Sequence, residues 1–421
     1  MKRGYFLLLA LCIGSLMFSG CTKKSQEPEK KEVRQEKSNT EQRAVKSDDN
    51  SKDSIAELEE KDSKGDLEES KDQGNVKDYL NSVIQGKNIL LMEPVEENTT
   101  LILTEEKAGV EAQVIDISER KLLSVTKKIS QGKAYQCQRY KDHFILQVTK
   151  RGKTGMIYPI YYIFDSKYQM KDILDIGKKR GDDAEMYEEC ILPGKKKIIY
   201  EEEIVGKRNY YQLGLSNYSL KKGKKIYQVD GKKTNCTHGM EEMIAGTGEE
   251  VIFYRGLFYK NMNEQTRSCY GCLDLKSGKM TMRHEVKTEQ EESKGMLVVG
   301  DEAYFYDGMV VEEENYTGKV YCMDSFGKTT VWKLKNKREG ERIISSDGGK
   351  YLATYYIDNE KEDSYKTIIH IYDRKTKKEM AKKVLNKSVS DLNIFDNGMI
   401  LVTYFGDTKT HLLEADWKAD Q

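Results

Sequence analysis

The chain has no excess of charge of either sign, because 70 basic side chains balance 70 acidic ones. Binding to nucleic acid depends largely on attraction between basic side chains and phosphates. A chain without a positive excess has no such long-range attraction. We therefore expect no nucleic-acid partner.

Long apolar segments, dense cysteines and common catalytic motifs are missing too. The one extended apolar stretch, Tyr5 to Phe18, has about 14 residues, fewer than the roughly 20 that span a bilayer. Eight cysteines are too few for a disulfide scaffold in a chain of 421 residues. A nucleophile elbow, a zinc-protease helix and a Walker-type loop are absent from the sequence. These absences give no reason to expect a cofactor.

The N-terminus has the order of a secretion signal. Lys2 and Arg3 precede the apolar stretch, and small residues follow it. The tetrapeptide Phe18-Ser19-Gly20-Cys21 resembles the bacterial lipobox. This resemblance implies a lipoprotein whose signal peptide, residues 1–20, is removed and whose Cys21 carries diacylglycerol. We expect a protein anchored by lipid to the extracytoplasmic face of the cell membrane, with an uncleaved anchor as the alternative.

The next segment, residues 21–77, is too polar to fold. From Thr22 to Lys77 there is no aromatic residue, and Lys, Glu, Ser and Asp dominate. Such a composition cannot bury enough apolar surface to offset the loss of chain entropy. We expect a disordered, charged tether between the lipid and a folded domain at 78–421.

From residue 78 onward, turns alternate with short β-branched or aromatic runs typical of strands. Seven such runs recur: 101–104, 144–146, 198–200, 251–254, 303–306, 351–355 and 400–404. About twenty residues after each run, a second strand ends in an acidic or hydroxyl residue and a turn. These end residues are Asp116, Asp165, Ser219, Asp274, Asp324, Asp373 and Asp416.

The spacing of these end residues indicates the fold. They recur about every 50 residues with little helical periodicity, which is typical of a β-propeller. The pattern of strands and turns in each repeat resembles that of tryptophan-aspartate-repeat and related bacterial propellers. The resemblance is clearest in Ser346–Ala353 followed by Ile369–Asp373. We predict an all-β, seven-bladed β-propeller. The last repeat stops without an outer strand, which Val76–Gln85 is available to supply.

Two neighbouring apolar segments are candidates for a binding surface. Arg255–Met262 and Met309–Val311 are expected as loops on one face of the propeller. The alternative is that the strands simply continue and these side chains pack on a neighbouring blade. The candidate contact residues are Leu257, Phe258, Tyr259, Met262, Met309, Val310 and Val311.

One cluster has the composition of a metal or redox site. Cys269 and Cys272 have the spacing of a zinc knuckle, and Cys236 and His238 lie in the preceding connection. Residues three apart on a strand point to opposite sides, however. A disulfide or zinc stays an alternative to the favoured interpretation, which is ordinary buried thiols.

The sequence therefore favours a non-catalytic binding or scaffolding protein, whose partner is an envelope protein or a small ligand. The alternative is an extracytoplasmic hydrolase or lyase, acting on glycans or peptides at the central channel. The two can be distinguished structurally. An enzyme predicts converging titratable side chains with perturbed pKa values, whereas a scaffold predicts a broad apolar patch.

Overall fold

The computed structural model describes residues 88–414 except 97, 107–108, 120, 131–134, 141, 153–154, 156, 178–188, 205–209, 221–222, 229–236, 262–263, 285–294, 309–315, 362–363 and 407–409. Contacts divide the chain into Met1–Lys61 and Asp62–Gln421, and every described residue belongs to the second unit. Among these residues no helix is long and apolar enough to cross a membrane.

The described strands form seven antiparallel sheets, six of four strands and one of three. The first three sheets contain β1 (Asn88–Glu96), β2 (Thr99–Glu106), β3 (Gly109–Asp116) and β4 (Lys121–Ile129); β5 (Tyr135–Arg139), β6 (His143–Arg151), β7 (Ile157–Asp165) and β8 (Met170–Asp175); β9 (Glu189–Leu192), β10 (Lys197–Ile204), β11 (Tyr210–Asn217) and β12 (Lys224–Gln228). The fourth and fifth contain β13 (Thr237–Ala245), β14 (Val251–Asn261), β15 (Glu264–Asp274) and β16 (Met280–His284); β17 (Gly295–Val299), β18 (Glu302–Tyr306), β19 (Lys319–Asp324) and β20 (Thr329–Lys333). After the short 3₁₀ helix η2 (Lys337–Gly340), the last two contain β21 (Ile343–Ser345), β22 (Tyr351–Lys361), β23 (Ser364–Asp373) and β24 (Glu379–Leu385); β25 (Val389–Ile394), β26 (Met399–Tyr404) and β27 (Thr410–Glu414).

This architecture is a β-propeller, as the sequence predicted, but the count of blades differs. Each of the seven apolar runs lies in the second strand of a sheet, as in β2 and β26. The sequence predicted seven blades. The described residues form six complete four-stranded blades and one three-stranded sheet, β25-β26-β27. Val76–Gln85, predicted to supply the fourth strand there, lies outside the described residues.

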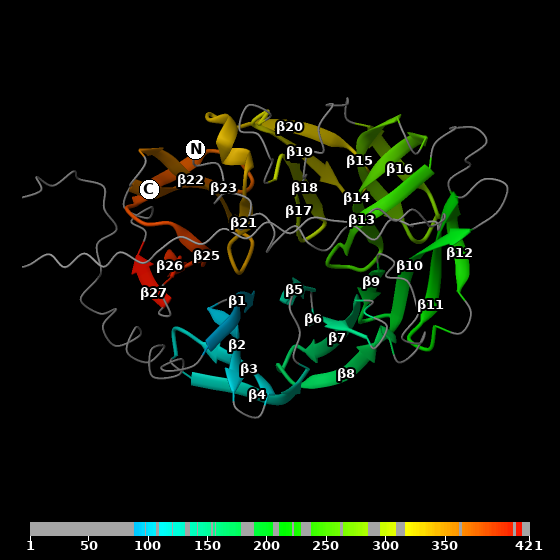
Figure 1. Ribbon diagram of the computed structural model, residues 1–421, viewed down its shortest axis with the longest axis horizontal. Helices are drawn as coiled ribbons and strands as arrows, with labels where there is room; N and C mark the ends of the chain where they lie inside the picture. Colours follow the sequence, from blue (N-terminus) through cyan, green and yellow to red (C-terminus); the bar gives the residue numbers. More distant parts are fainter. Residues whose placement is uncertain are drawn as a thin grey trace, which may run out of the picture. The chain divides into compact units, whose positions relative to one another are not determined.

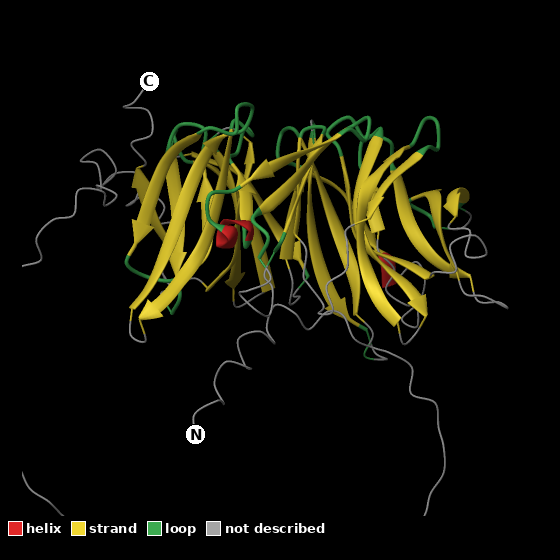
Figure 2. Cartoon of the chain, turned by 90° about the horizontal axis from the view of Figure 1, so that it is seen from above, coloured by secondary structure: helices red, strands yellow, loops and turns green. Residues whose placement is uncertain are grey.

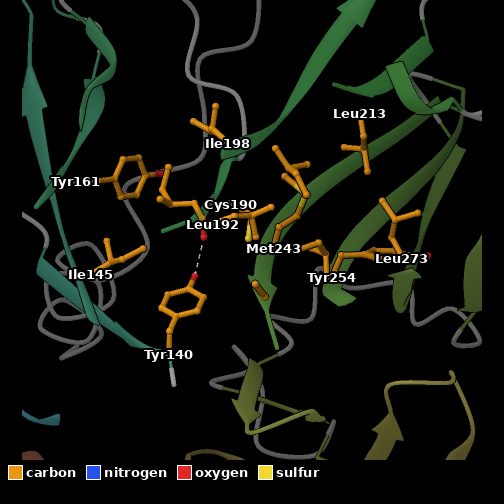
Figure 3. Packing of buried hydrophobic residues seen from close by; sticks show 14 of the residues in the cluster. Tyr140, Ile145, Tyr161, Cys190, Leu192, Ile198, Leu213, Met243, Tyr254 and Leu273 are labelled. Atoms are coloured by element: carbon orange, nitrogen blue, oxygen red, sulfur yellow. Dashed lines mark hydrogen bonds between the residues drawn. The ribbon is translucent and has the colours of Figure 1, made fainter. Parts of the chain in front are cut away.

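The strands in the middle of each blade are buried because neighbouring blades pack face to face. In β7 seven of nine residues are buried, whereas in the outer strand β8 only Leu174 is buried. Phe144 and Phe164 stack with their ring centroids 4.5 Å apart. Figure 3 shows the largest cluster, in which residues of the second, third and fourth sheets pack together.

Contacts between the first strands close the ring. β1 contacts both β5 and β25, and further contacts link β9 to β13, β13 to β17, β17 to β21 and β21 to β25. The Tyr140 hydroxyl donates to the Ile191 carbonyl (3.0 Å) and so links the second sheet to the third. In Figure 1 these first strands lie nearest the centre. The axis of the ring is therefore surrounded by one strand from each sheet.

Apolar packing and a buried carboxylate join the last sheet to the first. Met92 and Ile102 pack against Phe395 in one buried cluster. The carboxylate of Asp347, in the turn between β21 and β22, accepts hydrogen bonds from the backbone N–H groups of Asn98 (2.7 Å) and Asp396 (2.6 Å). We call this contact between the first, sixth and seventh sheets the Asp347 latch.

Figure 2 shows how the turns that connect the strands gather at two opposite faces.

Candidate functional site at the ring axis

Two acidic side chains meet where the last and first sheets adjoin. Glu93 comes from β1 and Asp391 from β25, and both are half-buried. Burial raises the pKa of the Glu93 carboxyl to about 8, and the charge of Asp391 contributes, while Arg139 opposes the shift. Burial also raises the pKa of Asp391 to about 6, although its Oδ1 accepts a hydrogen bond from the Leu392 N–H (2.9 Å). Both carboxyls therefore keep their protons to a higher pH than ordinary acidic side chains do, and Glu93 does so to a higher pH than Asp391.

Irregularities in the first strands accompany the acidic side chains. The pairing of β25 with β26 shifts between Val389 and Asp391, and that of β13 with β14 shifts between Met240 and Glu242. A β-bulge bends its strand and redirects the neighbouring side chains, and bulges are frequent beside active sites. Asp391 and Glu242 each follow directly after such a shift.

Arg139, at the end of β5, links the second sheet to the sixth. Its guanidinium donates to the Ser345 hydroxyl (2.8 Å) and to the carbonyls of Ser346 (3.4 Å) and Asp347. Asp347 is also the centre of the latch, so Arg139 connects the latch to the acidic pair. The arginine thereby places a fixed positive charge close to Glu93.

A second arginine and two tyrosines extend the site through the fifth and sixth sheets. Arg342, just before β21, lies over the ring of Tyr355 with its Cζ 5.4 Å from the ring centroid. Burial raises the pKa of Tyr355, which Arg342 opposes. Tyr306 lies against Gly295 of β17, where a Cβ atom would come within 2.2 Å of its ring. Glycine in this first strand is thus what makes room for a tyrosine ring near the axis.

An ion pair completes the arrangement on the fourth sheet. Arg255 Nε lies 2.7 Å from Glu242 Oε2, and both side chains are mostly buried. Burial raises the pKa of Tyr306, and the charge of Glu242 adds to this effect. We use the name axial cluster for the five residues at the centre of this network: Glu93, Arg139, Arg342, Tyr355 and Asp391.

The axial cluster can recognise several polar groups at once. A protonated carboxyl donates a hydrogen bond, an ionised one accepts, and guanidinium groups bind carboxylate or hydroxyl oxygens. Two carboxyls whose pKa values differ can also act as the general acid and the general base of a catalysed reaction. The described residues contain no group of three or more His, Cys, Asp or Glu side chains that could hold a metal ion.

The structure describes the backbone of one part of the predicted apolar surface. Leu257, Phe258 and Tyr259 lie within β14, which continues to Asn261 and pairs with both β13 and β15, so for these three residues the strand continues, as the alternative interpretation held, and they do not form a loop. The apolar, β-branched and aromatic pattern of the strand simply runs on through these residues. Met262, Met309, Val310 and Val311 lie outside the described residues, as does Cys21.

Among the described residues, the two cysteines of the predicted metal or redox cluster lie in different parts of the core. Cys269 packs in a core cluster with the second and third sheets, whereas Cys272 packs in another cluster with the fifth. The two thiols of β15 therefore point to opposite sides of their blade, as period-two alternation requires. His238 lies at the start of β13, and Cys236 lies outside the described residues. Cys269 and Cys272 cannot ligate one metal ion together.

Sequence reasoning missed every member of the axial cluster. The signal is weak: Glu93 stands between Met92 and Pro94 in β1, and Arg139 ends the largely polar strand β5. In an isolated strand this pattern indicates only a solvated face. The residues become a site because separate sheets bring them to one axis.

Comparison with known proteins bears on the fold alone. No protein-family model and no curated protein matches the chain. A solved acylaminoacyl peptidase in complex with Z-Gly-Gly-Phe-chloromethyl ketone is similar at 14% identity and a TM-score of 0.41, covering 67% of this chain and 44% of that one. An oligogalacturonate lyase in complex with manganese is similar at 12% identity and a TM-score of 0.44, covering 78% and 85%. The β-propeller domain of the trilobed protease from Pyrococcus furiosus shows 14% identity and a TM-score of 0.41, covering 68% and 83%.

The chain spans less than half the length of the acylaminoacyl peptidase that it resembles. Identities of this size accompany many unrelated functions on one fold. The function of the chain therefore has to be argued from its own residues.

Proposed function

We propose that this protein is a lipoprotein on the extracytoplasmic side of the membrane, and that its propeller binds a small polar ligand at the axial cluster without catalysing a reaction. The supporting observation is that charged and phenolic side chains from the first, second, sixth and seventh sheets converge at the axis. Structural charges are normally paired or solvated, and a half-buried acid with a pKa near 8 is a costly feature to maintain.

The ligand that best fits carries hydroxyl and carboxylate groups. Hydroxyls match the alternating donors and acceptors of Glu93 and Asp391, and a carboxylate matches the guanidinium of Arg342. Acidic sugars and hydroxy acids have this chemistry.

A direct test is binding of a panel of uronic acids, neutral sugars and hydroxy acids, measured by calorimetry. We expect at least one acidic ligand to bind the wild type and to lose about tenfold or more in affinity with Asp391→Asn. Asp274→Asn, at an exposed turn, is the matched control and should bind like the wild type. Equal binding by Asp391→Asn would contradict the axial site.

A second candidate function is hydrolysis or elimination on a glycan or peptide. The observation that favours it is the separation of the pKa values of Glu93 and Asp391, which would serve as general acid and general base. Incubation with oligosaccharides and peptides decides between the two roles. A product formed by the wild type and absent with Glu93→Gln would replace the binding proposal with catalysis.

The anchor is tested separately. Wild-type protein should partition into a detergent phase, and Cys21→Ser should stay in the aqueous phase. Partition of both into detergent would indicate an uncleaved apolar anchor instead of the lipid.

A further inference from the structure

A polar cavity lies between the fifth and sixth sheets, and none of the residues that line it belongs to the axial cluster. It has a volume of about 460 Å³. The turn between β17 and β18 and the strands β19 and β20 form one wall, and the turn between β23 and β24 forms the other. Its lining residues are Gly300, Asp301, Glu302, Cys322, Thr330, Arg374, Lys375 and Lys377. We call this cavity the interblade groove.

Lys377 stands where neighbouring repeats have glycine. In the fourth and fifth sheets the corresponding turns place Gly278 and Gly327 at φ values of 68° and 78°, and Lys377 adopts a φ of 57°. In each turn this residue donates its N–H to the carbonyl of the preceding aspartate. The left-handed conformation favours glycine because it has no Cβ atom. The corresponding turns of the second and third sheets also hold non-glycine residues here, Tyr168 and Leu220, at φ values of 59° and 55°, so it is the side-chain contacts of Lys377 that distinguish it.

The lysine side chain extends into the neighbouring blade. Its Nζ donates to the Tyr304 hydroxyl (3.0 Å) and to the Arg374 carbonyl (2.6 Å), and it lies 4.3 Å from the centroid of the Tyr304 ring. Trp332 is the second ring beneath it, at 5.7 Å. The amine is thus fixed in the groove, and two of its three N–H groups have partners in these contacts.

The charges of the groove favour an anion. Arg374 lies 3.3 Å from Glu302, which also accepts from the Tyr304 hydroxyl (2.7 Å), so this carboxylate is already matched. Asp301 accepts a long hydrogen bond from the Gly248 N–H (3.4 Å). Lys375 and Lys377 then leave a positive excess, and burial lowers the pKa of Lys377, with Arg374 contributing. The buried Nε of Arg374 has no hydrogen-bond acceptor in the described part of the chain.

We propose that the interblade groove binds a small free anion of the phosphate or carboxylate class, held by Lys377 and Arg374. The site does not depend on the axial cluster or its ligand. Its volume suits a small molecule. An anion beside the amine stabilises its charged form, so binding should weaken at alkaline pH as Lys377 loses its proton.

The probe for this test is inorganic phosphate, titrated by calorimetry at constant ionic strength and about pH 7. Lys377→Met removes the amine, and Lys378→Met removes the same charge from the next, exposed residue outside the groove. We expect Lys377→Met to weaken phosphate binding about tenfold or more and Lys378→Met to leave it unchanged. Lys377→Gly restores the residue of the neighbouring turns, so it should fold well and lose binding equally.

Three results would overturn the proposal. They are no phosphate binding by the wild type up to about 10 mM, equal binding by Lys377→Met, or equal weakening by Lys378→Met. Flotation with phosphatidylglycerol vesicles distinguishes the source of the anion. Vesicle binding that requires Lys377 without binding of free phosphate would assign the groove to a lipid headgroup instead. Glu93→Gln should bind phosphate normally, which separates this test from that of the axial site.

Discussion

Carboxylates at the turns of the propeller and carboxylates at its axis have opposite electrostatic environments. Asp274 and Asp373 end the third strands of their sheets, and hydrogen bonds from backbone N–H groups two and three residues later lower their pKa values. Glu93 and Asp391 lie near the axis, where burial raises their pKa values. The same chemical group thus stabilises a turn in one region and resists ionisation in the other.

The difference shows which carboxylates are structural. A turn aspartate is satisfied by its own local backbone, so its ionised form fits the fold. An axial carboxyl is placed by strands far apart in sequence, and its ionised form opposes the fold. Substitution of a turn carboxylate should therefore lower stability and leave ligand binding unchanged. Substitution of an axial carboxyl should weaken ligand binding without lowering stability.

The largest effect is expected at Asp347, which combines both environments. It is 7% exposed, and its carboxylate accepts from backbone groups of two other sheets. Asp347→Ala would leave the N–H groups of Asn98 and Asp396 without acceptors and should lower the free energy of unfolding by about 2–4 kcal/mol. Urea denaturation measures this loss, with Asp347→Asn as the milder comparison. A loss below about 0.5 kcal/mol would show that the latch does not join the sheets.

The next effect is a pH dependence produced by Glu93. Its pKa is raised from 4.5 to about 8 in the folded protein, so the folded state holds a proton that the unfolded state releases. The stability that this carboxyl contributes is complete below its unfolded pKa and is lost as the pH rises toward 8. Glu93→Gln mimics the protonated form. It should unfold like the wild type near about pH 4 and be more stable by on the order of 2 kcal/mol above about pH 8.

Thermal or urea unfolding at several pH values measures this difference, and Asp274→Asn serves as a control from the turns. Parallel curves for Glu93→Gln and the wild type would mean that the axial carboxyl is freely ionised, and the contrast between the two regions would disappear.

The smallest of these effects belongs to a turn carboxylate. Asp373 accepts hydrogen bonds from the N–H and hydroxyl of Thr376 (2.8 and 2.7 Å). Asp373→Ala should lower the free energy of unfolding by about 1 kcal/mol, and Asp373→Asn, which keeps the acceptor oxygen, should lower it less. Ligand binding at the axis should be unchanged in both variants, as calorimetry can show. If Asp373→Asn altered ligand binding at the axis, the turn carboxylates and the axial cluster would not be independent of each other.

Parts of the fold and little of the site could be predicted. The period of about 50 residues and the acid-ended turns follow from local patterns, and they identified the second and third strands of the sheets. The sequence left open whether Leu257–Tyr259 form a loop or continue their strand, because the answer depends on their pairing with β13. The count of complete blades was wrong for a related reason, since a repeat in sequence does not specify how many strands pair in its sheet.

The sequence alone therefore determined the repeat, the strands and the turn carboxylates, because each depends on hydrogen bonds or alternation within a few residues. Only the tertiary structure decided the axial cluster and the interblade groove. Glu93 and Asp391 come from the two ends of the described chain, and Lys377 reaches Tyr304 in another blade. Their pKa values and contacts arise from burial between sheets, which no local segment contains.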